Sequence, residues 1–99
     1  MGCSKSADAP KRPFSASEVR GQRLYQGSCA VCHRADSTDP LNGPGLQGMY
    51  AKKYLPSGSP ANDERVGEVI RRGRRSMPGY ANTYDDRQLN DLIAYLKTL

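Results

Sequence analysis

Apolar residues recur at helical spacing most clearly near the end of the chain. Asp85 is a candidate N-cap, and Gln88 stands three residues later, where its side chain completes a capping box. The residues that follow at intervals of three and four, on one face of a helix, are Leu89, Leu92, Ile93, Leu96 and Leu99. The pattern predicts an amphipathic helix from Asp85 to the C-terminus.

Two earlier segments carry shorter helical patterns. In residues 62–72, Val66, Val69 and Ile70 share a face, Asn62 or Asp63 is a candidate N-cap, and Gly73 suits the position just after the helix. A first helix is predicted to begin near Ser17 as N-cap and to end at Gly27.

Gly21 lies in the middle of this first predicted helix. Glycine there costs about 1 kcal/mol relative to alanine, so its presence needs a reason. We expect a second helix to cross closely at Gly21, leaving no room for a side chain.

The remaining chain reads as loop. Residues 34–60 are rich in turn signals, with a short helix predicted around 46–53. Residues 1–14 are polar, contain proline and lack periodicity, so they are predicted to be a tail, and residues 15–99 a single domain. No segment shows the alternation of apolar and polar residues that is typical of a β-strand. No stretch of sequence approaches the ~20 apolar residues that a membrane-spanning helix needs. The predicted class is all-α.

Large aliphatic and aromatic side chains are scarce for a domain of this size. Leu, Ile, Val and Phe together number 15 of 99 residues, Trp is absent, and the formal net charge is +5. A chain so composed is near the disordered range unless something other than its own side chains fills the core.

The cysteines indicate which group fills the core. Cys29 and Cys32 lie in Cys-Ala-Val-Cys-His, the pattern for covalent attachment of a c-type haem, with His33 as the first iron ligand. Half of a zinc site is disfavoured because no second Cys-x-x-Cys and no other histidine exist. A thioredoxin-like dithiol would need strands, and none is predicted.

The second axial ligand must then come from a residue other than histidine. Met49 and Met77 are the candidates apart from the initiator. Met77 is favoured because Pro78 and Gly79 make a compact loop that could hold a thioether on iron, whereas Met49 reads as ordinary core packing.

Positive charge gathers next to Met77. The basic residues of this segment are Arg65, Arg71, Arg72, Arg74 and Arg75. A basic rim of this kind would steer an acidic redox partner, and a merely solvated helix face explains it equally well. Nucleic acid is disfavoured, since no aromatic residues are interleaved with the charges.

Five segments in this order resemble the small class I monohaem cytochromes c. They are Gly21–Tyr25, Cys29–His33, Gly43–Leu46, Val69–Gly73 leading to Met77-Pro78, and Leu92–Leu96. Arg34 departs from the family, in which many members carry glycine after the histidine. Which residues bind the haem propionates stays open among Tyr50, Tyr54, Lys52 and the arginines.

The resemblance implies a fold of three to five helices around one covalent haem, with the N- and C-terminal helices crossing near Gly21 and Tyr95. It implies that the Pro44 carbonyl accepts a hydrogen bond from His33 and that Leu46 packs on the ring. Other residues expected to wrap the ring are Ile70, Tyr80 and Leu96. Without haem, the chain is expected to be largely unfolded.

The implied function is one-electron transfer between redox partners of a respiratory or related chain, by a monomer that is not an enzyme. Two alternatives stay open. The first is a cytochrome domain or subunit of a larger oxidoreductase, and the second is a haem enzyme or ligand sensor with a displaceable sixth ligand.

The family also implies a location in the periplasm or on another extracytoplasmic face. Cys3, followed by a polar tether, has two interpretations: the lipidated start of a bacterial lipoprotein tethered to the membrane, or a plain cysteine in a tail.

Overall fold

The structure, a computed structural model, describes residues 13–41, 43–56, 58–74 and 77–99. Its elements in chain order are helix α2 (Ala16–Ser28), the 3₁₀ turn η1 (Met49–Ala51), helix α3 (Asp63–Arg72) and helix α4 (Asp86–Leu96). The described ranges hold three α-helices, no named strand, and two isolated bridges. The all-α prediction is therefore confirmed.

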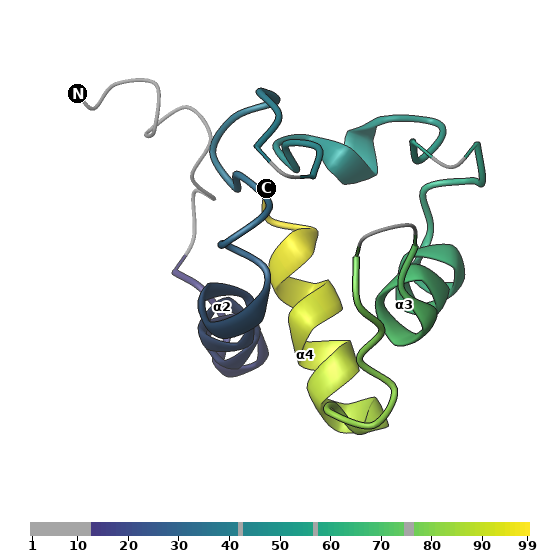
Figure 1. The fold of residues 1–99 in the computed structure, drawn as a ribbon. Helices are drawn as coiled ribbons and strands as arrows, with labels where there is room; N and C mark the ends of the chain where they lie inside the picture. The colour runs from purple at the N-terminus through teal and green to yellow at the C-terminus, as the bar shows by residue number, and fades with distance from the viewer. Residues whose placement is uncertain (1–12, 42, 57, 75–76) are drawn as a thin grey trace.

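Helices α2 and α4 pack side by side, with α3 against the other flank of α4 (Figure 1). The α2–α4 pair forms the most extensive contact between elements. The segment that contains η1 runs across one end of the helices. None of the helices in the described ranges is long and apolar enough to cross a membrane.

Helix α2 begins two residues earlier than the sequence predicts. Its N-cap is Ser15, whose hydroxyl accepts from the Glu18 N–H at 3.1 Å while the Glu18 carboxylate accepts from the Ser15 N–H at 2.9 Å. A cap at Ser17 would place Glu18 at the first helical position, where this reciprocal box cannot form. The helix also ends at Ser28, one residue beyond Gly27.

Ser17 instead joins α2 to α4. Its hydroxyl donates to the buried Asp91 carboxylate at 3.0 Å, and the Arg20 guanidinium pairs with the same carboxylate at 2.9 Å. The hydrogen bond from Arg20 is the main reason that the pKa of Asp91 lies below its ordinary value. This polar link fixes the register of the two helices.

The expected close crossing occurs at Gly21. A Cβ atom there would lie 1.9 Å from the Asp91 carbonyl oxygen and 2.8 Å from the Cβ of Tyr95. Tyr95 packs edge-on against Tyr25, with ring centroids 5.4 Å apart. The sequence prediction that α2 and α4 meet at Gly21 and Tyr95 is confirmed.

Replacing Gly21 with alanine should destabilise the holoprotein by about 3 kcal/mol or more, because the obstructing atoms are α4 backbone. Gly27→Ala is the matched control in the same helix, since nothing lies within 4 Å of a Cβ at Gly27. The control should be neutral or gain up to about 1 kcal/mol from helix propensity. Urea unfolding of both proteins checks the difference, and equal midpoints would refute the close crossing.

The other two helices begin as predicted. Asn62 caps α3, Asp85 caps α4, and Gln88 completes the capping box. Helix α4 ends at Leu96 instead of continuing to Leu99, because the Thr98 N–H turns back to Tyr95 with a three-residue hydrogen bond. Leu99 still packs against the core.

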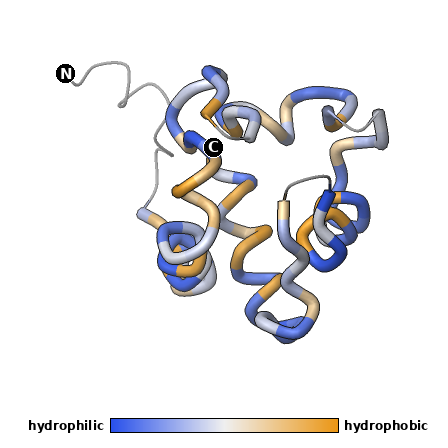
Figure 2. The backbone as a smooth tube through the Cα atoms, in the orientation of Figure 1, coloured by the Kyte–Doolittle hydropathy of each residue, from blue (hydrophilic) through white to orange (hydrophobic). Residues whose placement is uncertain are grey.

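The core lies where α4 meets both other helices. Hydrophobic positions recur along α4 (Figure 2), and Leu89, Leu92, Ile93 and Leu96 are buried, Leu92 completely. Phe14 lies before the predicted domain start, yet it packs edge-on against Tyr95 at 6.1 Å between ring centroids. Residues 1–12 of the predicted tail lie outside the described residues.

The short helix predicted around 46–53 is reduced to the single turn η1. Gly48 precedes it with φ +69°, a left-handed conformation that an α-helix does not contain. The segment therefore does not form a regular helix, and its packing against the hydrophobic core holds it in place.

Candidate functional site

A largely apolar cavity opens between α3, α4, the end of α2 and the loops. Every residue predicted to bind or ligate the cofactor lines it: Cys29, Cys32, His33, Pro44, Leu46, Ile70, Met77 and Tyr80. Leu96, also expected to wrap the ring, lines it as well. Their chemical roles remain predictions at this point, but their convergence on one cavity is a structural fact.

The attachment segment is a tight turn at the end of α2. The N–H groups of Cys32 and His33 both donate to the Cys29 carbonyl, at 3.1 and 2.9 Å. The Tyr25 hydroxyl donates to the His33 carbonyl at 2.7 Å and so ties the turn to α2. This geometry brings both thiols to the same cavity, with no disulfide between them.

Burial, followed by the neighbouring Cys32, raises the pKa of the Cys29 thiol to about 11. A redox-active Cys-x-x-Cys needs the opposite shift, because the thiolate is the attacking species. Among the described residues, no three His, Cys, Asp or Glu side chains gather to hold a metal ion. Both competing interpretations of the cysteines, redox dithiol and zinc site, are thereby weakened.

His33 is oriented by the loop that follows it. Its Nδ1 lies 2.8 Å from the Pro44 carbonyl oxygen. Because a carbonyl can only accept, Nδ1 carries the proton and Nε2 keeps the lone pair that a metal ligand needs. A Cβ at Gly43 would lie 2.5 Å from the ring carbon Cε1, so a side chain there would displace the imidazole.

Met77 lines the same cavity from the segment that follows α3, far along the chain from His33. Its backbone exchanges two hydrogen bonds with Arg74, at 2.9 and 3.1 Å. The Tyr80 N–H donates to the Ile70 carbonyl at 2.9 Å, which fastens the loop to α3. The Tyr80 ring stacks on Tyr84 with centroids 5.4 Å apart, and the Tyr84 hydroxyl hydrogen-bonds Ser28. The loop that carries Met77 is thus tied to the end of α2.

Several further cavity residues were not assigned by the sequence to binding the cofactor. They are Ser28, Gly43, Met49, Leu55, Pro56, Val66, Val69, Arg74, Pro78 and Leu92. Met49 packs on the core, as expected, but it also faces this cavity, which its sequence context does not signal. The helical members could have been found by extending the apolar face of α3 and α4.

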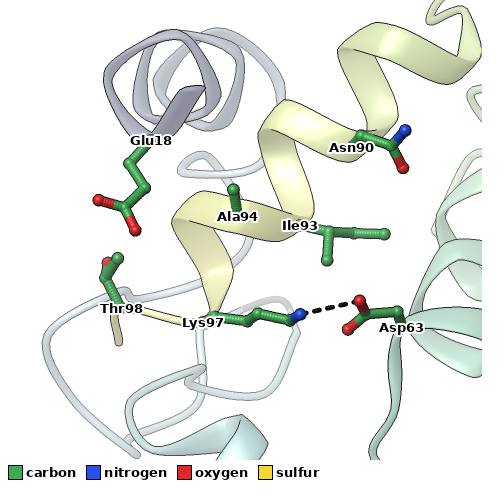
Figure 3. Close-up of a pocket in the computed structure, with 7 residues that line it drawn as sticks. All are labelled: Glu18, Asp63, Asn90, Ile93, Ala94, Lys97 and Thr98. Atoms are coloured by element: carbon green, nitrogen blue, oxygen red, sulfur yellow. Dashed lines mark hydrogen bonds and ion pairs between the residues drawn. The ribbon is translucent and has the colours of Figure 1, made fainter. Parts of the chain in front are cut away.

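A second depression lies on the far flank of α4 (Figure 3). Its volume is about 630 Å³, against about 270 Å³ for the cavity with the cysteines. Its charged groups are engaged within the protein: Lys97 pairs with Asp63 at 2.8 Å, and Glu18 takes part in the capping box. The chemistry of the lining, not size, identifies the functional cavity.

The predicted basic rim is neutralised only in part, because two of its arginines share one carboxylate. Arg65 and Arg72 pair with Glu68 at 3.2 and 3.9 Å, and Arg71 pairs with Asp86 at 3.2 Å. Arg75 lies outside the described residues. These exposed pairs are worth at most about 1 kcal/mol each, but they cancel charge locally.

The cavity fits a covalently held haem. It offers two thiols at one end, an imidazole with Nε2 available, a thioether, and apolar walls. Gly43 leaves space beside the imidazole that any side chain would fill. Each of these features answers a separate requirement of c-type attachment and axial ligation.

Sequence similarity to known proteins supports the same cofactor. The family model described as "Cytochrome C oxidase, cbb3-type, subunit III" matches residues 16–96. A cytochrome c6 of Bryopsis maxima is 31% identical over 78 residues, covering 77% of this chain and 84% of that protein. A cytochrome c6 of Picosynechococcus is 24% identical over 86 residues, covering 84% of this chain and 74% of that protein.

A longer relative is the cytochrome bc1 complex cytochrome c subunit of Corynebacterium diphtheriae. It is 33% identical over 89 residues, which make up 84% of this chain and 27% of that protein. The domain therefore also occurs as part of larger subunits. Together with the geometry of the cavity, these matches show that the chain belongs to the small class I monohaem cytochromes c and that its cofactor is one covalently bound haem c.

Proposed function

We propose that the protein carries single electrons on a haem c whose iron is ligated by His33 and Met77. Electron transfer by a c-type haem follows from the family, and the assignment of the ligands and attachment residues is ours. Cys29 and Cys32 would hold the group by adding each S–H across a haem vinyl, sulfur to one carbon and hydrogen to the other. When bound, the haem supplies a ferric/ferrous couple.

The observation that carries this proposal is that His33 and Met77 line one cavity from two separate chain segments. His33 has its Nδ1 committed to Pro44, so Nε2 is the nitrogen left for iron. His33 is also the single histidine of the chain, which excludes a second imidazole from within it. An iron site with both axial positions filled has no open position for substrate, which favours electron transfer over bond chemistry.

Other residues of the cavity would exclude water from the haem and keep its axial ligands in a fixed orientation. Leu46, Ile70 and Tyr80 are partly or fully buried and give the cavity apolar walls, which exclude water. A thioether ligand and a low-dielectric surrounding both favour the ferrous state and raise the reduction potential. Pro44 fixes the tautomer of His33, which keeps that ligand in one orientation in both oxidation states.

The test is carbon monoxide binding by the reduced native protein at neutral pH, alongside a redox titration. We expect no carbon monoxide complex and a reversible one-electron transition. A carbon monoxide complex forming readily in the native protein would instead support the ligand sensor or haem enzyme with a displaceable sixth ligand.

We propose a redox partner protein that presents acidic groups, although the ion pairs on α3 leave fewer free arginines than the sequence suggests. An extracytoplasmic location, where c-type haem attachment takes place in the family, is part of the proposal. A lipid tether at Cys3 belongs to it as well, and Cys3 lies outside the described residues.

A role as a domain of a larger oxidoreductase is the second candidate. It is favoured by the match to the bc1 complex protein and by a match to one component of the nicotinate dehydrogenase of Pseudomonas putida. The latter is 34% identical over 98 residues but covers only 8% of that protein. The chemistry at the haem would be the same, with a fixed partner in place of a diffusing one.

A further inference from the structure

Three consecutive backbone carbonyls at the end of the attachment turn are hydrogen-bonded from two different parts of the protein. The loop of residues 43–46 donates its backbone N–H groups to the first and third of them, those of Cys32 and Arg34, both at 2.7 Å. The carbonyl between them, that of His33, accepts instead from the Tyr25 hydroxyl at 2.7 Å. The backbone at the histidine is therefore held by a loop and by a side chain of α2.

Tyr25 contacts the attachment turn at both of its ends. Its backbone carbonyl accepts from the N–H groups of Cys29 and Ala30, at 2.8 and 3.0 Å, where α2 passes into the turn. Its hydroxyl meets the turn again at the His33 carbonyl. One residue of α2 thus fixes the backbone at the first thiol and the peptide that follows the histidine.

The Tyr25 ring is itself held firmly between two helices. The residue is only 1% exposed, and its ring packs edge-on against Tyr95 where α2 and α4 cross. The crossing is close at Gly21, one helical turn before Tyr25, where a side chain has no room. Because hydrogen bonds are directional, a hydroxyl on so constrained a ring defines where its acceptor lies. The helix crossing therefore sets the position of the His33 carbonyl.

Packing at the crossing explains an aromatic ring at position 25, but it does not explain the hydroxyl. Phenylalanine would supply the same ring without a polar group that must leave water. A buried hydroxyl costs free energy unless it is hydrogen-bonded, and the partner of this one is the carbonyl of His33. The reason for the hydroxyl therefore lies at the histidine.

We propose that Tyr25 is a positioning residue for the axial ligand. Its hydroxyl fixes the peptide that follows His33, while the Pro44 carbonyl fixes the imidazole through Nδ1. The two contacts act on the backbone and on the ring of the same residue, and together they leave the imidazole one orientation. The proposal rests on the proposed function, because it assumes that His33 ligates the iron of a haem held by Cys29 and Cys32.

The experiment uses Tyr25→Phe in the haem-loaded protein, a change that keeps the ring and removes only the hydroxyl. Tyr84→Phe is the matched control, because its hydroxyl bonds to the Ser28 hydroxyl at the same end of α2. Hydrogen exchange of the Cys32 and His33 N–H groups in the reduced protein measures opening of the attachment turn. The spread of the haem methyl resonances in the proton NMR spectrum of the oxidised protein reports the orientation of the axial ligands.

We expect Tyr25→Phe to speed exchange at Cys32 and His33 by roughly tenfold or more, the effect of leaving one buried carbonyl without its donor. The spread of the haem methyl resonances should change as well, because Pro44 alone would then orient the histidine. Exchange of the Ile70 N–H in α3 should change less, which separates opening of the turn from a general loss of stability. Tyr84→Phe should leave the exchange at the turn and the methyl resonances as in the native protein.

Unchanged haem methyl resonances in Tyr25→Phe would overturn the proposal, even with faster exchange, because the hydroxyl would then stabilise the fold without orienting the ligand. Equal changes in Tyr25→Phe and Tyr84→Phe would overturn it too. Failure of the proposed function shows separately in the native protein, whose His33 ring protons would then lack the large hyperfine shifts of an iron ligand.

Discussion

A variant with both Cys29→Ser and Cys32→Ser is expected to lose all covalently bound haem and most of its folded structure. The reason lies in the overlap between the cavity wall and the core. Five residues are both buried core and cavity lining: Leu55, Val66, Ile70, Leu92 and Leu96. Without the haem, these side chains lose the surface against which they pack, in a chain already poor in aliphatic residues.

Haem staining after denaturing electrophoresis and circular dichroism check this prediction. Cys3→Ser is the matched control and should keep both haem and fold, because Cys3 lies outside the attachment motif. A double variant that remains compact, with sharp near-ultraviolet circular dichroism, would show that the polypeptide alone completes the core.

The second large effect is expected from Met77→Ala. Removing the thioether should vacate the sixth iron position, allow carbon monoxide to bind the reduced protein, and lower the reduction potential. The decrease should be on the order of 0.1 V, within the roughly 0.8 V range that axial ligands span.

Met49→Ala is the control that makes this experiment decisive, because Met49 lines the same cavity. It should cost packing energy, about 2 kcal/mol or more, while leaving the ligands of iron unchanged. Carbon monoxide binding by Met49→Ala and not by Met77→Ala would reverse the assignment of the ligand.

The helices and the attachment site could be predicted because their signals are local. Asp85 with Gln88, and Asn62 before α3, lie within four residues of the groups they cap. The crossing at Gly21 was predictable because a glycine inside a helix is costly and needs a neighbouring backbone to justify it.

The parts that the sequence did not predict depend on contacts between distant segments. The cavity contacts of Met49 and Arg74 come from loops whose course is set by turns such as Gly48 and Gly73 and by packing on the helices. The wrong N-cap of α2 has a simpler cause. Ser15 and Ser17 are equally good caps by residue type, and only the position of Glu18 three residues after Ser15 separates them.

The most direct test of covalent attachment and methionine ligation is the visible spectrum of the purified protein, oxidised and reduced. We expect a haem that resists acid-acetone extraction, a reduced spectrum of a low-spin c-type haem, and a weak long-wavelength band from methionine–iron ligation in the oxidised form. The band should vanish in Met77→Ala. A haem that can be extracted, or a native oxidised spectrum without the methionine band, would contradict covalent attachment at Cys29 and Cys32 or ligation by Met77.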